Sequence, residues 1–329
     1  MKETGNRLRY SSMRSRLKVI IGLPLLVVGL VFAIVYAIWG SYGVHSLVRN
    51  GISFWLPVSM DSQRLSPSMR LALASAPEAN PGPLAWQKIA DGFEVADLPA
   101  RVDGHDVDHI YLARIDPARF RFALRNRPSG DRDLDDWMKT LRPTLVVNAS
   151  YFAKGGRPDT PFLTDGTLLG PKSYDARAGA FVSSAEFTGV RNLAHEDWST
   201  AFQGADNAVV SYPLLVRDGT SGVAHSSRWL ANRSFVGQDA TGQIIIGTTT
   251  DAFFSLDRLA QFLIAAPLQL TMALNLDGGP VACQGIALKG YERKTYGRYE
   301  LEVEGSKAQL LTMSYGTPAM PVVLAVFPK

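Results

Sequence analysis

Residues 19–39 contain no charged side chain, and this run limits how the rest of the chain can be placed. At about 1.5 Å of rise per residue, a helix of this length spans the hydrocarbon core of a bilayer. Basic residues precede the run, and Tyr36 and Trp39 lie at its far end. The positive-inside rule predicts a single-pass signal anchor in the inner (cytoplasmic) membrane, with a cytoplasmic N-terminus and a periplasmic or extracellular body. A cleaved signal peptide is the alternative, although its apolar region is usually shorter.

Positive charge is concentrated at the start of the chain. The first eighteen residues hold six Lys or Arg side chains against Glu3, whereas the whole chain has a net charge of +4. The remainder is therefore close to neutral and has no basic stripe of the kind that nucleic-acid surfaces carry. We expect a membrane as a partner, and no nucleic acid.

Composition divides the chain into four parts. Residues 66–83 are rich in Ser, Ala and Pro, a composition that disfavours helix and sheet. After them, short alternating segments dominate, with short helices expected at 134–141 and after Ser255. The fold class predicted is α+β: a mixed or antiparallel sheet core with few helices, preceded by one N-terminal transmembrane helix. The four parts are a basic cytoplasmic tail (1–18), the anchor (19–39), a stalk or linker (40–83) and a globular domain (84–329).

An amide and a carboxylate follow a short predicted core strand in the last third of the chain. Asn275 and Asp277 flank the apolar Leu276, so in an extended chain their side chains should point the same way. Gly278 and Gly279 then let a ligand or the backbone approach closely. An ordinary Asp-Gly turn, in which the side chain bonds its own backbone, is the plainer interpretation. In the company of the motifs below, the segment indicates the edge of an active site.

A second apolar strand also ends in an asparagine, Asn148. Tyr151 follows it, and an aromatic face beside amides and carboxylates suits a sugar ring. Arg233 lies in a mostly apolar segment, where a cation either extends to the surface or faces an anion. Asp159 is a second carboxylate candidate. We expect the site to assemble where the strands ending at Asn148 and Asn275 lie adjacent.

Together these motifs resemble, in kind and order, those of phosphodiester glycosidase domains, the family of the mannose-6-phosphate uncovering enzyme. The resemblance covers roughly residues 105–328 and rests on VVNASYF at 146–152, NRSFVG at 232–237, a Ser-capped helix and ALNLDGG at 273–279. It implies a glycosidase that hydrolyses a sugar phosphodiester at the glycosidic side, releasing the sugar and leaving a phosphomonoester. It assigns Asp277, Asn275 and Arg233 to catalysis, and Asn148, Tyr151, Gly278 and Gly279 to substrate binding. We add Asp159, the second carboxylate candidate, to the substrate-binding residues.

The residue types suggest a role for each of these side chains. Arg233 would bind the phosphodiester, and Asp277 would serve as nucleophile, base or electrostatic stabiliser. Asn148 and Asn275 would hold hydroxyls or the phosphate, and Tyr151 would stack on the sugar. We expect no cofactor and no metal.

The sequence departs from the family in two places. Ser150 stands where a glycine is common, and residues 280–282 (Pro-Val-Ala) replace the usual third glycine and serine. The second change removes a hydroxyl and stiffens the loop. It favours the rival hypothesis, a membrane-anchored, non-catalytic glycan-binding or scaffolding protein of the cell envelope. The enzyme hypothesis places the activity in envelope or exopolysaccharide metabolism.

The sequence gives little support to two other kinds of site, a metal site and a nucleophilic cysteine. A divalent cation bound by Asp159, Asp165 and Asp277 has no recognised ligand spacing behind it. Cys283 is the single cysteine, so no intramolecular disulfide can form, and without a Cys–His signature it is expected to pack in the core.

Overall fold

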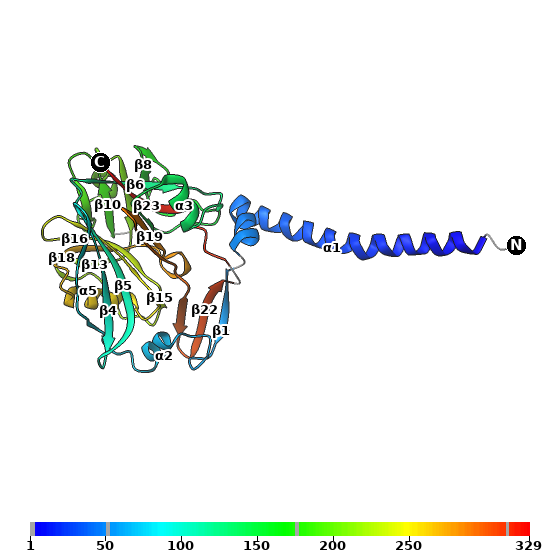
Figure 1. Cartoon of the computed structure of the whole chain (residues 1–329), viewed down its shortest axis with the longest axis horizontal. Helices are drawn as coiled ribbons and strands as arrows, with labels where there is room; N and C mark the ends of the chain where they lie inside the picture. The colour runs from blue at the N-terminus through cyan, green and yellow to red at the C-terminus, as the bar shows by residue number, and fades with distance from the viewer. Residues whose placement is uncertain (1–3, 51–52, 175–177, 314–315) are drawn as a thin grey trace.

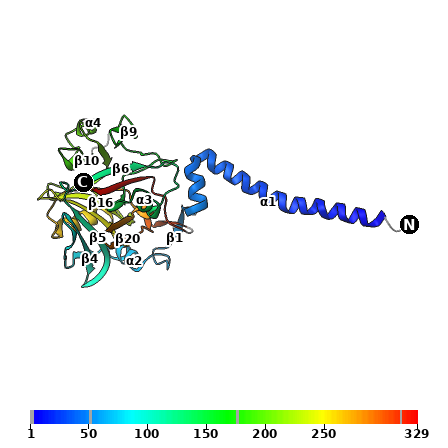
Figure 2. The ribbon, with the colours of Figure 1, turned by 45° about the horizontal axis from the view of Figure 1, so that its top comes forward.

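A computed structural model describes residues 4–50, 53–174, 178–313 and 316–329. One long helix, α1 (Thr4–His45), extends away from a body of sheets, as Figures 1 and 2 show. Within the described residues, one helix is long and apolar enough to cross a membrane, with a mean hydropathy of 2.4 over its window in Leu23–Arg49. This confirms a single N-terminal apolar helix with the dimensions of a membrane span, which a signal sequence would share.

The helix changes direction near its end because Gly40 has a positive φ of 60° with ψ of −151°. Only glycine adopts such a backbone conformation readily. The short segment beyond Gly40, together with η1 (Ser46–Asn50), packs on the globular body.

Antiparallel pairs make up the sheets, as the α+β prediction requires. The largest sheet has nine strands, and β18 lies inside it, between β13 and β16. Its order is β14 (Thr220–Ser221), β13 (Leu214–Arg217), β18 (Leu270–Asn275), β16 (Ser234–Asp239), β17 (Ile244–Thr249), β5 (His105–Ile115), β4 (Phe93–Val102) and β2 (Asn80–Pro81), with β3 (Gln87–Ala90) also on β4.

Three smaller sheets surround it. One has the order β20 (Tyr291–Thr295), β19 (Gln284–Leu288), β7 (Leu145–Asn148), β23 (Val322–Pro328) and β6 (Phe120–Asn126). Another has β11 (Thr188–Asn192), β10 (Gly179–Ser183), β12 (Asn207–Ser211), β8 (Phe162–Thr164) and β9 (Thr167–Leu168). The third has β1 (Ser53–Val58), β22 (Lys307–Met313), β21 (Glu300–Glu304) and β15 (Leu230–Ala231).

The short helices are α2 (Pro67–Ala74), α3 (Leu134–Leu141), α4 (Trp198–Ala201) and α5 (Leu256–Ala265). The helices predicted at 134–141 and after Ser255 are confirmed as α3 and α5. A 3-10 turn, η2 (Gly279–Val281), follows β18.

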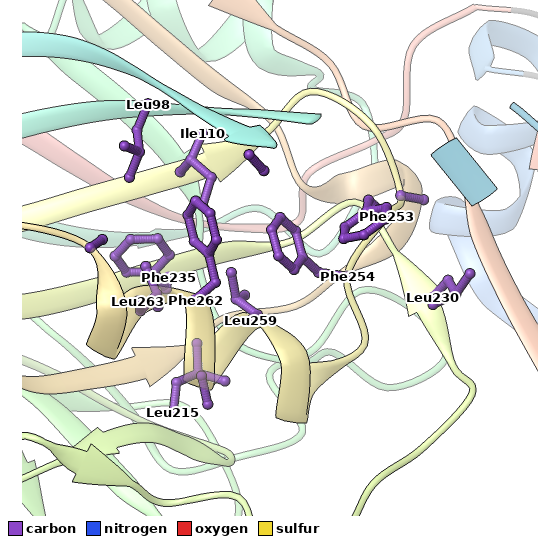
Figure 3. Packing of buried hydrophobic residues seen from close by; sticks show 14 of the residues in the cluster. Leu98, Ile110, Leu215, Leu230, Phe235, Phe253, Phe254, Leu259, Phe262 and Leu263 are labelled. Carbon is purple, nitrogen blue, oxygen red and sulfur yellow. The ribbon is translucent and has the colours of Figure 1, made fainter. Parts of the chain in front are cut away.

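The nine-stranded sheet is apolar on both faces, because successive residues of its strands point to opposite sides. In β16, Phe235 packs toward α5 and Val236 packs toward the sheet that contains β7. Figure 3 shows the first of these layers, in which the Phe254 ring lies between those of Phe262 and Phe253, with centroids 5.1 Å apart in each pair. Burial of each such side chain stabilises the fold by about 1.5–3 kcal/mol. This double-sided core fixes β18 firmly, and with it the segment that follows.

The prediction that residues 66–83 avoid helix and sheet is wrong. Ser66 caps α2 by accepting a hydrogen bond from the Met69 N–H (3.2 Å), and Pro67 occupies its first turn. Serine followed by proline is a helix-start signal. The serine side chain accepts one of the first backbone N–H groups, which have no partner within the helix, and proline has no N–H that would need one. Met69 and Ala72 then bury against the main core. Strand β1 also pairs with β22, so the interval described above as a stalk is packed on the domain from residue 53 onward.

Candidate active site

Strands β7 and β18 meet at their C-terminal ends. They belong to different sheets, so the expectation that they lie adjacent as strands is wrong: each is paired with other partners on both sides. The Asn148 Nδ2 atom nevertheless donates to the Asp277 carbonyl at 2.7 Å, and the Asp277 N–H donates to the Ala149 carbonyl at 3.0 Å. The two predicted motifs therefore form one site at the edge between two sheets.

Tyr151 is held by Asn275 and by a residue that the sequence analysis missed, Tyr212. The Tyr151 hydroxyl donates to the Tyr212 carbonyl (2.7 Å), and Asn275 Nδ2 donates to the Tyr151 hydroxyl (2.9 Å) and to the same carbonyl (3.1 Å). The two rings stack with centroids 4.5 Å apart. Burial raises the pKa of Tyr151 well above its usual range, so the phenol stays neutral. Tyr212 covers one face of Tyr151 and is itself 41% exposed, so its own outer face is available to a ligand.

Arg233 is a buried cation that faces the site. Its side chain is 5% exposed, its Nη2 donates to the Trp229 carbonyl at 2.8 Å, and its Nε donates to the Phe254 carbonyl at 3.5 Å. Burial lowers the pKa of Arg233, whereas Tyr151, Glu300 and Asp277 oppose that shift. Guanidinium keeps its charge in proteins, so this is a fixed positive charge beside acidic groups.

Asp277 lines a cavity of about 230 Å³ together with Glu300. Its Oδ1 accepts the Gly278 N–H at 2.9 Å. Burial first, and then the charge of Glu300, raise the pKa of Asp277 to about 8, against the opposing effects of the Gly278 N–H and Arg233. An acid with a pKa near neutrality in a cavity is a common mark of a catalytic group.

Glu300 is the second functional candidate that the sequence analysis missed. It begins β21, and its Oε1 accepts a hydrogen bond from Trp229 Nε1 at 2.9 Å. Burial also raises its pKa, while Arg233 lowers it. Its surrounding sequence, ELEVE, has the alternation of a strand with one solvated face, so only the tertiary structure shows that this carboxyl lies beside Asp277.

Each of the two glycines after Asp277 occupies a position where a side chain would meet a different neighbour. A Cβ on Gly278 would lie 3.2 Å from Arg233 Nη1, so the glycine leaves room for the guanidinium. Gly279 has φ of +69°, and a Cβ there would lie 2.5 Å from Glu300 Oε2. Both positions therefore shape the site rather than merely ending a strand.

The amide oxygens of Asn148 and Asn275 are buried and have no hydrogen-bond partner within the described residues. A buried acceptor without a donor is costly, and such groups mark places where a water or ligand completes the network. These two amides thus combine a structural role, through their Nδ2 atoms, with free acceptor capacity at the site.

Other candidates lie outside the cavity that Asp277 lines. Asp159 is exposed and lies near Tyr212, whose pKa is raised by burial and by the charge of Asp159. Cys283 is buried, its thiol donates to the Pro280 carbonyl at 3.4 Å, and burial raises the thiol pKa to about 12, as befits a packing residue. Across the described ranges, no group of three or more His, Cys, Asp or Glu side chains is placed to hold a metal ion.

Comparison with known proteins identifies the same region. Residues 142–282 match the phosphodiester glycosidase family, and this range contains every site residue that the sequence predicted but not Glu300. The match confirms the resemblance drawn from the motifs. No curated protein matches the chain.

Two solved structures are also similar to this chain. The chain is similar to the catalytic domain of zebrafish N-acetylglucosamine-1-phosphodiester alpha-N-acetylglucosaminidase, described as auto-inhibited by its pro-peptide, with 17% identity, 84% of this chain and 88% of that chain covered, and a TM-score of 0.52. It also matches a putative exported protein from Burkholderia pseudomallei K96243, with 11% identity, coverage of 71% and 74%, and a TM-score of 0.41. The zebrafish structure confirms the predicted α+β fold with mostly antiparallel sheets.

Proposed function

We propose that this chain hydrolyses a sugar 1-phosphodiester at the bond between the sugar carbon and the phosphate oxygen. The match of residues 142–282 to the phosphodiester glycosidase family supports this activity. The products are the free sugar and a phosphomonoester. The observation that carries this proposal is that two carboxyls, Asp277 and Glu300, line one cavity, while a buried cation, Arg233, lies behind Gly278 of its wall and interacts electrostatically with both. A phosphodiester needs the cation, and a sugar carbon under attack by water needs the carboxyls.

Arg233 holds the phosphate. Its two backbone carbonyl partners fix the guanidinium, and its Nη1 lies beside Gly278, where no side chain intervenes. Guanidinium binds phosphate oxygens through paired hydrogen bonds, and in a buried setting the attraction is stronger than in water. Arg233 also stabilises the negative charge that grows on the leaving phosphate.

Asp277 in its ionised form takes a proton from the attacking water. The water oxygen bonds to the sugar C1, the bond from C1 to the bridging oxygen breaks, and that oxygen leaves with the phosphate. A phosphomonoester has a second pKa near 6, so it departs without a proton donor. A base works best with a pKa close to the working pH, which the environment of Asp277 provides. Glu300 stabilises the positive charge that develops on the sugar ring.

The aromatic pair and the two asparagines position the sugar. Tyr151 is bonded and stacked on one side, so we assign the sugar to the exposed outer face of Tyr212 and give Tyr151 the role of supporting it. Asn275 fixes this pair through two hydrogen bonds. Asn148 ties the Asp277 backbone to β7 and so sets the position of the base.

The natural substrate is proposed as an envelope or exopolysaccharide component, with the domain outside the inner membrane and held by residues 19–39. N-acetylglucosamine is the first sugar to test, because the zebrafish relative is named for it. No residue role above requires a cofactor or a divalent cation.

The test uses the full chain in detergent with aryl phosphodiesters and UDP-linked forms of several sugars, scoring free sugar and free phosphomonoester in parallel. We expect the wild type to release both products and Asp277→Asn to release neither. Sugar binding without turnover by the folded chain across the whole panel would overturn the enzyme proposal in favour of the non-catalytic glycan-binding protein.

A further inference from the structure

The cavity that contains Asp277 and Glu300 is lined by two kinds of residue. A sugar and a phosphate need polar partners, and Asp277, Gly278 and Glu300 provide them. Much of the remaining wall is apolar, which suits a hydrocarbon group rather than another sugar or a nucleotide. The apolar part of the wall includes Tyr42, Phe152, Val281, Leu311 and Met313.

One of these apolar residues belongs to the anchor helix. Tyr42 follows Gly40 in α1, and its ring meets the ring of Phe152 edge-on, with centroids 5.8 Å apart. Gly156 makes room for it, since a Cβ there would lie 3.0 Å from the Tyr42 ring. Figures 1 and 2 show the end of α1 against the globular body, and Tyr42 places this end at the cavity. With the apolar helix as the anchor, the cavity lies where the chain leaves the membrane.

Further contacts hold the anchor in this position. His45 Nδ1 donates to the Ser129 carbonyl at 2.9 Å, and Arg49 forms an ion pair with Asp136 at 2.8 Å. These contacts lie on the domain side of Gly40. The relation between anchor and cavity is thus built into the fold and does not depend on a free linker.

Strand β22, which lines the cavity, pairs with β1, a strand that carries exposed aromatic residues. Leu311 of β22 lies opposite Trp55 of β1 in the strand register, and Phe54 and Trp55 are 39% and 38% exposed. Trp39 at the end of the apolar helix is 39% exposed as well. Exposed tryptophan and phenylalanine beside an anchor are typical of the boundary between lipid and water.

Cationic residues complete this surface. Lys154 and Arg157 are exposed and line a crevice with Trp39 between the anchor and the domain. Positive side chains beside an anchor attract anionic headgroups. The same charges favour a membrane-borne phosphodiester approaching from the bilayer.

We propose that the second ester of the phosphodiester is a long-chain lipid alcohol, and that the enzyme takes this substrate from the membrane that holds its own anchor. The inference rests on the proposed function and names its substrate class. The sugar and phosphate occupy the Asp277 and Arg233 part of the site, and the start of the hydrocarbon chain lies along Leu311, Met313 and Phe152. Val281, one of the residues that replace the family's usual glycine and serine, adds to this apolar wall. Hydrolysis releases the sugar to water and leaves the lipid phosphomonoester in the bilayer.

The experiment is a competition in one vessel. The full chain in phosphatidylcholine vesicles receives equal amounts of the hexadecyl and methyl phosphodiesters of N-acetylglucosamine, or of the sugar that the aryl panel identifies. Mass spectrometry of hexadecyl phosphate and methyl phosphate gives the ratio of the two kcat/KM values. We expect hexadecyl phosphate to exceed methyl phosphate by about tenfold or more, because the apolar wall removes several methylenes of the longer chain from water. A phytanyl ester in place of the hexadecyl ester distinguishes isoprenoid from straight-chain lipids, and preference for either chain over methyl supports the proposal.

Substitution separates the cavity from simple partitioning into the vesicle. Leu311→Asn should reduce the hexadecyl-to-methyl ratio roughly fivefold or more, since an amide on this wall opposes the chain. Met313→Gln is the second variant, in case Leu311→Asn folds poorly. Leu169→Asn changes an exposed leucine outside the cavity and should keep the wild-type ratio. Methyl phosphate in equal or greater amount, or an unchanged ratio in both wall variants, overturns the lipid proposal while leaving the proposed function intact. Release of neither phosphate overturns both.

Discussion

Glu300 raises the pKa of Asp277 across a shared cavity, although Glu300 belongs to β21 and Asp277 follows β18, a strand of a different sheet. Like charges in a buried site disfavour each other's ionisation, so one carboxyl is readily ionised only while the other is protonated or compensated. The pair is compensated in part by Arg233, and this balance sets the pH at which the site works.

Activity should rise with pH through the titration of Asp277. The proposed role requires the carboxylate, and its pKa is about 8, so kcat/KM for an aryl phosphodiester should increase from pH 6 and level off above about pH 9. A pH–rate profile on the full chain measures this directly. A fall in kcat/KM through the same range would assign Asp277 as an acid instead of a base.

Glu300→Gln should move this profile to lower pH. The substitution removes a negative charge that raises the pKa of Asp277, so the midpoint shifts downward while Arg233 remains in place. The maximal rate should also fall, by roughly 10²-fold, because a charge that stabilises the sugar cation is lost. An unshifted midpoint would show that Glu300 does not act on Asp277.

Asp277→Asn should abolish turnover, with a loss of about 10³-fold or more, and leave the fold intact. The amide keeps an acceptor for the Gly278 N–H but cannot accept a proton from water. Asp91→Asn, at an exposed aspartate, is the matched control and should retain the wild-type rate. Near-normal activity in Asp277→Asn would remove Asp277 from the mechanism.

The same variant tests the burial of Asp277 through stability. The folded state raises the pKa of this carboxyl, so the native protein holds the proton more tightly than the unfolded chain does. Its contribution to stability is therefore complete at low pH and is lost as pH rises from about 4 toward 8. The melting temperature of Asp277→Asn relative to wild type should increase over that interval.

Arg233→Lys should weaken recognition of the phosphate more than recognition of the sugar. Lysine keeps a positive charge but loses the planar fork and the two carbonyl contacts that fix it. We expect kcat/KM for an aryl phosphodiester to fall about 10²-fold, with a smaller change for the corresponding aryl glycoside, which lacks phosphate. Equal losses on both substrates would indicate general damage to the site. Arg125→Lys, at a partly exposed arginine paired with Asp165, serves as the control.

Asp108→Asn should destabilise the fold without touching the site. The Asp108 carboxylate accepts hydrogen bonds from the N–H groups of His109 (2.7 Å), Asp251 (2.9 Å) and Thr250 (3.1 Å). In the amide, an NH2 group replaces Oδ2, which accepts the N–H of buried Phe253 at 3.4 Å, so a buried donor loses its acceptor. We expect a loss of about 1–3 kcal/mol in the free energy of unfolding by denaturant titration. Asp106→Asn, at a half-exposed ion pair, should change it by less than about 1 kcal/mol.

The sequence by itself determined the helices and strands whose signals lie in residues adjacent along the chain. The uncharged run, the helices at 134–141 and after Ser255, and the strands that end at Asn148 and Asn275 all follow from local periodicity and caps. The family resemblance followed from short motifs in a fixed order, and the family match confirms it. Local patterns failed at α2, where Ser66 and Pro67 read as a linker but start a helix that is stabilised by burying Met69 in a distant core.

Only the tertiary structure decided which side chains share the site. Glu300 lies in an alternating segment typical of a half-exposed strand, and Tyr212 lies in a strand-like segment interrupted by Pro213, so neither pattern marks a site residue. Their meeting with Asp277 and Tyr151 depends on how separate sheets pack. Burial, which sets the charge state of Asp277 and Arg233, is likewise a property of that packing. A sequence specifies the residues available to each strand end. The distances between strand ends, and the electrostatic interactions that depend on them, arise from contacts between residues far apart in the chain.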